Sequence, residues 1–115
     1  MTAEERQEAL AQLVAQGDHR AAEVIGAALR DSHWPACVEF AAALARISGE
    51  AAKAQLLLAL KARRHHVRSA AVKALATLDG DNVRDAIQAL TNDPSYEVRQ
   101  DVVEALLNGR GDDQE

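Results

Sequence analysis

The hydrophobic positions of this chain recur at a spacing of 31 residues. The clearest register consists of four leucines, namely Leu13, Leu44, Leu75 and Leu106. A second register holds Leu10, Ala41, Val72 and Val103, and the glycines Gly49, Gly80 and Gly111 keep the same step. A fixed period between about 20 and 50 residues is typical of proteins built from stacked repeats. We therefore predict a repeat protein in which equivalent apolar side chains are buried at equivalent places.

Two helical segments fit within each period, because the apolar residues follow the i, i+3, i+4, i+7 spacing of a helix face. Asp18 is suited to cap one segment, and Pro35 is suited to the first turn of the next. The predicted helices cover about 3–16, 19–30, 35–47, 51–62 and 66–78, then one capped by Asp81 and one that ends before Asn108.

The composition supports a fold made only of helices. Aromatic residues are 3% of the chain while alanine is abundant, which favours helices packed through small side chains. We predict an all-α, right-handed α-α superhelix (α-solenoid) of about seven helices, in which one leading helix precedes three helical hairpins. Residues 1–108 form this single domain, and the polar residues 109–115 are expected to be a flexible acidic tail.

The strongest repeats carry a recognisable motif. The run Val67-Arg68-Ser69-Ala70-Ala71-Val72 and the run Asp93-Pro94-Ser95-Tyr96-Glu97-Val98-Arg99 resemble the second helix, and the turn before it, of the short HEAT repeats of phycobilin-lyase-like proteins. The resemblance covers about residues 18–108 and implies that the turn aspartate caps the helix while the arginine after valine bonds to a neighbouring repeat. Arg68, Arg99, Asp31 and Asp93 are therefore structural candidates first.

Two repeats depart from this motif. In the first, Ala36-Cys37 stands where Val-Arg would be, although Asp31-Ser32 keeps the turn. In the second, Ala62-Arg63 replaces the Asp-Pro step. We expect the turn chemistry of these two repeats to differ from that of the third.

Charge is distributed unevenly along the chain. Residues 1–45 hold three basic and seven acidic side chains (−4), residues 46–78 seven and one (+6), and residues 79–115 three and ten (−7). A positive band over residues 61–73 therefore lies between two acidic ends. Its members are Lys61, Arg63, Arg64, His65, His66, Arg68 and Lys73, which we expect to converge around one turn.

Two features are candidate contact sites for a partner. The basic band is one, and its alternative interpretation is a solvated turn balanced by the acidic flanks. The other is a row of rings, Trp34, His65 and Tyr96, which stand 31 residues apart and so share one edge of the stack. The alternative for Trp34 is that it covers the gap between the first repeats.

We predict no catalytic, cofactor or metal site. Cys37 follows His33 by four residues, but Pro35 interrupts the helix that would align them as a nucleophile and base. His65 and His66 are adjacent, so on a helix they should point about 100° apart and chelate one ion poorly. The single cysteine favours a reducing, cytoplasmic setting, and no apolar stretch is long enough for a membrane span or export signal.

These patterns predict a non-catalytic adaptor or scaffold that binds another protein through an acidic or extended segment, as a monomer. Nucleic-acid binding through residues 61–73 is the first alternative, and we do not favour it because the chain is acidic and the band spans one repeat. A role as accessory subunit of a lyase is the second alternative, and it rests on the resemblance alone.

Overall fold

The computed structural model describes residues 2–78 and 80–113, with side chains described as far as residue 108. Within that part the chain forms seven α-helices and no strand. The helices are α1 (Ala3–Gln16), α2 (His19–Arg30), α3 (Ala36–Ile47), α4 (Gly49–Ala59), α5 (His65–Leu75), α6 (Asp81–Gln88) and α7 (Tyr96–Asp113).

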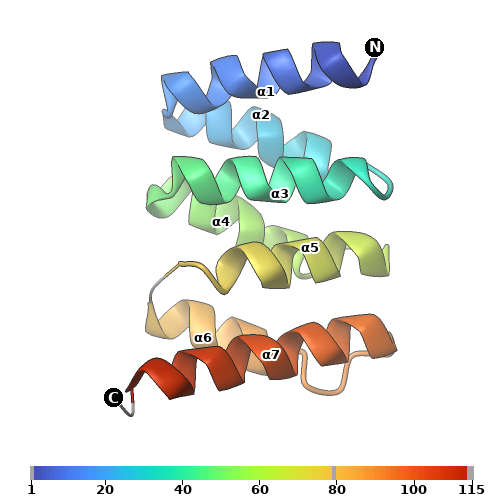
Figure 1. Cartoon of the computed structure of the whole chain (residues 1–115), viewed down its shortest axis with the longest axis vertical. Coiled ribbons are helices and arrows are strands. Elements are labelled where there is room, and N and C mark those ends of the chain that lie inside the picture. The colour runs from blue at the N-terminus through green and yellow to red at the C-terminus, as the bar shows by residue number, and fades with distance from the viewer. Residues whose placement is uncertain (1, 79, 114–115) are drawn as a thin grey trace.

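The helices stack in two layers. One layer holds α1, α3, α5 and α7, and the other holds α2, α4 and α6 (Figure 1). This is the predicted α-solenoid, with α1 leading the hairpins α2–α3, α4–α5 and α6–α7. The turns inside the hairpins, residues 31–35, 60–64 and 89–95, all lie along one side of the stack, at the right in Figure 1. We call this side the turn edge.

The four leucines that define the period all contribute to the core. Leu44 and Leu75 are fully buried, while Leu13 and Leu106 at the two ends are partly buried and pack against the core. Within the second register, Val103 is the exception at 52% exposed. It lies on α7, the last helix among the described residues.

A glycine allows α2 and α4 to approach closely. A Cβ atom added at Gly26 would lie 2.7 Å from Gln55 Cβ, so only glycine fits this contact without a shift. The helix accepts the low propensity of glycine because the packing requires it.

One of the two predicted helix caps is confirmed and the other is wrong. Asp18 caps α2 as predicted, since its Oδ1 accepts a hydrogen bond from the Ala21 N–H at 2.8 Å. Asp81 does not cap α6, because it is the first helical residue and Gly80 takes the cap position at a φ of 138°. Glycine adopts this positive φ, which would strain any other residue.

Several helix ends also differ from the prediction. α4 and α5 end at Ala59 and Leu75, a few residues early, because single-turn bonds of the i to i−3 type close their last turns. α7 continues past residue 108 to Asp113, since glycine lowers helix stability without forbidding the helix. The flexibility predicted for residues 109–115 stays a prediction, and residues 114–115 lie outside the described part. No helix among the described residues has both the length and the apolar character needed to cross a membrane.

Candidate functional site

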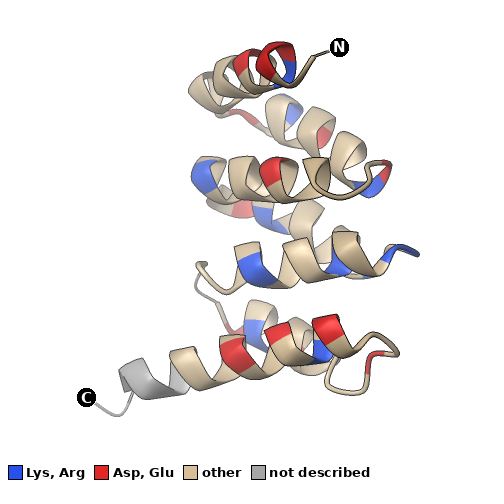
Figure 2. Cartoon of the chain, turned by 45° about the vertical axis from the view of Figure 1, so that its right-hand side comes forward, with Lys and Arg blue, Asp and Glu red and all other residues tan. Residues whose placement is uncertain are grey.

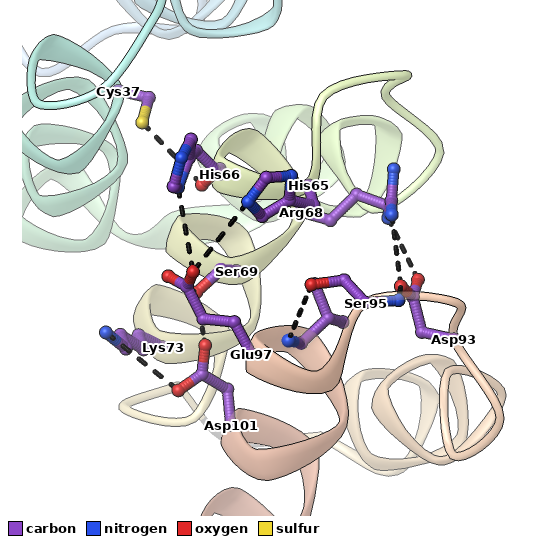
Figure 3. A network of polar contacts seen from close by, with 11 residues as sticks. Cys37, His65, His66, Arg68, Ser69, Lys73, Asp93, Ser95, Glu97 and Asp101 are labelled. Atoms are coloured by element: carbon purple, nitrogen blue, oxygen red, sulfur yellow. Dashed lines mark hydrogen bonds and ion pairs between the residues drawn. The ribbon is translucent and has the colours of Figure 1, made fainter.

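The junction between the second and third hairpins is closed by an ion pair. Arg68 Nε and Nη2 donate to the two carboxylate oxygens of Asp93 at 2.9 and 3.0 Å (Figure 3). Arg68 Nη1 also donates to the carbonyl oxygens of Ala62 and Arg63, each at 2.8 Å. The two charged side chains are 13% and 3% exposed. Arg68 is thus held by its own repeat and the next one, which favours a structural role over a contact with a partner.

Asp93 organises its own turn as well. Its Oδ1 accepts from the Ser95 N–H at 2.9 Å, and its carbonyl oxygen accepts from Arg99 Nη1 at 2.6 Å. Burial raises the pKa of Asp93, but the hydrogen bonds from Arg68 and Ser95 and the charges of Arg68 and Arg99 outweigh it, so the pKa lies below its ordinary 3.8. The carboxylate therefore stays charged in the folded state.

The junction between the first and second hairpins lacks this closure. Cys37 occupies the place of Arg68, and Ala62 occupies the place of Asp93, so neither partner of the ion pair is present. Asp31, which keeps its place in the first turn, is exposed. Departure from the repeat motif therefore leaves this junction open.

A basic pocket occupies the open junction. It has a volume of about 570 Å³ and is lined by Arg30, Asp31, Ala62, Arg63 and Arg64, which we call the arginine pocket. Arg63 and Arg64 are exposed, although Arg64 Nη1 contacts the Ser32 carbonyl oxygen at 3.3 Å. Arg30 reaches it from the last turn of α2 and donates to Gln55 Oε1 at 2.6 Å.

Helix ends of both dipole signs meet at the turn edge. Among the described side chains, none caps the first turn of α3 or of α5, whose positive dipole ends face this edge. The C-terminal ends of α2 and α4 lie at the same edge and have the opposite sign, so the positive charge of the arginine pocket comes from its guanidinium groups. In Figure 2 basic residues mark the turn before α5, while acidic residues gather on α1 and α7.

The predicted row of rings is exposed at both ends. Trp34 and Tyr96 are 62% and 70% exposed. Trp34 nevertheless contacts the next repeat, since its ring centre lies 6.3 Å from that of His66. The guanidinium of Arg99 lies 5.9 Å from the Tyr96 ring centre.

The two adjacent histidines lie together instead of pointing apart. The ring centres of His65 and His66 are 4.0 Å apart. His65 is the first residue of α5, where no preceding helical turn restricts the side chain, so the expectation taken from a regular helix is wrong here. Both imidazoles face Glu97 of α7, with nitrogen–oxygen distances of 3.8 and 3.7 Å.

Lys73 lies away from the turn edge. It stands near the other end of α5, about 12 Å along the axis from His65 at 1.5 Å per residue. Its Nζ lies 3.9 Å from Asp101 Oδ1, while the buried Ser69 hydroxyl donates to the same carboxylate. The basic band therefore does not converge on one turn, and its exposed guanidinium groups are those of the arginine pocket.

Cys37 is unsuited to nucleophilic attack in this structure. The thiol is fully buried, and its Sγ lies 3.6 Å from the carbonyl oxygen of His66. Burial raises the pKa of the Cys37 thiol, which disfavours the thiolate that a nucleophile needs.

Two features were missed by the sequence reasoning. Arg30 belongs to the arginine pocket. Its position 31 residues before Lys61, a member of the basic band, could have indicated this. An apolar groove of about 600 Å³ also lies between α4 and α6. The run Leu56-Leu57-Leu58 could have indicated it, because three consecutive leucines of a helix cannot all face one core. The groove is lined by Ala54, Leu57, Leu58, Leu60, Lys61, Asn82, Ala86, Ala89 and Leu90.

Comparison with known proteins adds no identification: no family model matches the chain, and no curated protein matches it either.

Proposed function

We propose that this chain is a non-catalytic, HEAT-type adaptor that binds an acidic segment of another protein at the arginine pocket. The observation that carries the proposal is the convergence of Arg30, Arg63 and Arg64 around an open space of about 570 Å³. Guanidinium groups suit this task because they bind carboxylates in a planar, bidentate geometry.

The size of the pocket favours a protein segment over nucleic acid. Three guanidinium groups and one carboxylate, that of Asp31, line a space large enough for a few side chains. Tight binding to a duplex requires a longer track of phosphate contacts, and the acidic residues of α1 and α7 would repel its continuation (Figure 2). Exposed Trp34, on the same turn as Asp31, adds an aromatic anchor of the kind enriched at protein interfaces.

Other parts of the proposal rest on sequence. The HEAT assignment follows from the Asp-Pro and Val-Arg motifs, and a cytoplasmic location follows from the single cysteine. We propose a monomer because exposed acidic side chains, among them Glu4, Glu8 and Glu104, lie on the first and last helices, where they oppose end-to-end pairing.

Capture of partners from native lysate tests the proposal. The immobilised chain is compared with Arg63→Glu/Arg64→Glu, which reverses two charges of the arginine pocket. The matched control is Arg20→Glu/Arg46→Glu, which makes the same change in net charge at two exposed arginines near the opposite side of the stack. The proposal expects a protein that the wild type and the control capture and the pocket variant loses at least tenfold.

A gel shift with random-sequence duplex DNA decides the alternative. The proposal expects no shift at low salt. A shift that weakens steeply with salt and disappears in Arg63→Glu/Arg64→Glu would overturn it in favour of nucleic-acid binding.

A further inference from the structure

Three metal-binding side chains meet where the first turns of α5 and α7 pack together. They are His65, His66 and Glu97, and Figure 3 shows both imidazoles turned toward the carboxylate. One donor atom from each residue lies within 4.8 Å of the other two. Because α5 and α7 belong to different repeats, the cluster bridges a repeat junction.

The two distances between the carboxylate and the imidazoles are close to the donor spacing of a tetrahedral zinc site, while the two imidazole nitrogens lie within 4.8 Å of each other. Metal–ligand bonds of about 2.0–2.1 Å place neighbouring donors about 3.4 Å apart. The distance from Glu97 Oε2 is 3.8 Å to His65 Nε2 and 3.7 Å to His66 Nδ1. Each exceeds the tetrahedral spacing by less than half an ångström, which small side-chain rotations supply.

One of the donors has no hydrogen-bond partner. His66 Nδ1 is buried, and no described group forms a hydrogen bond with it. A buried polar atom left without a partner is costly, and a metal ion at this position would satisfy it.

The charge balance also favours a cation between these groups. The ion pairs that Glu97 makes within the described residues are with the two imidazoles, which are charged only when protonated. Its neighbour one turn along α7, Asp101, has Lys73 as a permanent cation at 3.9 Å. A bound divalent ion would give Glu97 a permanent counter-charge of the kind that Lys73 gives Asp101.

A neighbouring group holds one of the ligands in position. Cys37 Sγ lies against the His66 carbonyl oxygen and fixes the backbone of the first turn of α5. Such outer contacts orient ligands and raise metal affinity.

From this geometry we propose that His65, His66 and Glu97 bind a divalent first-row transition-metal ion of the zinc type. Two imidazoles and one carboxylate suit zinc, cobalt or nickel better than magnesium or calcium, which prefer oxygen ligands. The three ligands are 45%, 38% and 47% exposed, so water can reach a fourth coordination position.

Titration of the untagged, purified chain with ZnCl2 and CoCl2 at pH 7.5 tests the proposal. We expect one equivalent of zinc to bind by calorimetry and one equivalent of cobalt to give the visible bands of a four-coordinate ion. Affinity should fall as the pH is lowered, because protons compete with the metal ion for its ligands. No saturable binding, or binding unchanged at pH 5, would overturn the proposal.

Matched variants assign the ligands. His66→Ala and Glu97→Gln should each weaken zinc binding at least tenfold, the size of effect that even outer contacts have. His19→Ala/His33→Ala removes the other two histidines and should bind zinc as the wild type does. Equal losses in this control would show adventitious binding to surface histidines and contradict the proposal.

A measurement on the wild type removes any dependence on how the variants fold. Substoichiometric Ni²⁺ should broaden the NMR signals of His65, His66 and Glu97 before those of His19 or His33. The reverse order would overturn the assignment.

Discussion

Two junctions in the same stack occupy equivalent places in the repeat and have opposite characters. Between the second and third hairpins, Arg68 and Asp93 form a buried, bidentate ion pair that closes the turn. Between the first and second, Cys37 and Ala62 hold those places, and the arginine pocket lies open. The comparison teaches that a repeat junction without the motif leaves its turn arginines exposed, because it lacks the buried carboxylate that holds Arg68.

The comparison also separates two kinds of arginine. Arg68 makes four hydrogen bonds and is 13% exposed, whereas Arg63 and Arg64 are exposed in the adjoining turn. Sequence position alone puts all three in one basic band. Their roles differ because only Arg68 lies opposite a buried carboxylate.

The largest effect is expected from breaking the closed junction. Arg68→Ala should lower the free energy of unfolding by about 3–5 kcal/mol, because it leaves the Asp93 carboxylate buried and unpaired. Urea unfolding followed by circular dichroism measures the loss. Arg63→Ala is the control and should change stability by no more than about 0.5 kcal/mol. Equal losses in the two variants would remove the distinction between the junctions.

The next effect comes from building the ion pair into the open junction. Cys37→Arg alone buries a guanidinium without a partner, and adding Ala62→Asp supplies one. The free energy of unfolding of the double variant should exceed the value expected from adding the effects of the two single substitutions. We expect this coupling energy to be about 1–3 kcal/mol. A double-mutant cycle in urea measures it. Strict additivity would mean that the two junctions are not geometrically equivalent.

A smaller effect is expected from pH. The pKa of Asp93 is lower in the folded chain than its ordinary 3.8, so its contribution to stability is present above that value and lost as the pH falls through the folded pKa. The urea midpoint of the wild type should therefore fall as the pH drops below about 4. Arg68→Ala removes the largest of the causes that lower the pKa of Asp93, so the stability of this variant should fall less over the same pH range. A parallel pH dependence in both proteins would contradict this account.

The smallest effect on stability is expected in the open junction itself. Arg63→Glu/Arg64→Glu should leave the free energy of unfolding within about 0.5 kcal/mol of the wild type, because both side chains are exposed. Partner capture should nevertheless be lost. A destabilised variant would mean that the two arginines support the fold, which would undermine their assignment as contacts.

The fold could be predicted from the 31-residue period, because stacked repeats bury equivalent side chains at equivalent places. Leu44 and Leu75 must lie at equivalent places if equal helices stack, and both are fully buried. The pairing of Arg68 with the next repeat was implied by the HEAT resemblance. Both inferences depend on residues that recur along the chain, and such recurrence can be seen in a single sequence.

The parts that the sequence did not predict depend on contacts between distant residues. Glu97 drew no attention because it meets His65 and His66 only when α5 and α7 pack together. Arg30 joins Arg63 and Arg64 only across a repeat junction. Side-chain direction at the first turn of a helix also escapes the 100° rule, which is why the two imidazoles were expected to point apart.

The central claim is that the open junction, and not the closed one, receives an acidic partner. An NMR titration of the labelled chain with a synthetic oligoglutamate peptide tests it residue by residue. The account predicts the largest shift changes at Arg30, Arg63, Arg64 and Trp34, with the Arg68 and Asp93 signals unmoved. Changes centred on the Arg68–Asp93 turn, or none that saturate, would contradict it.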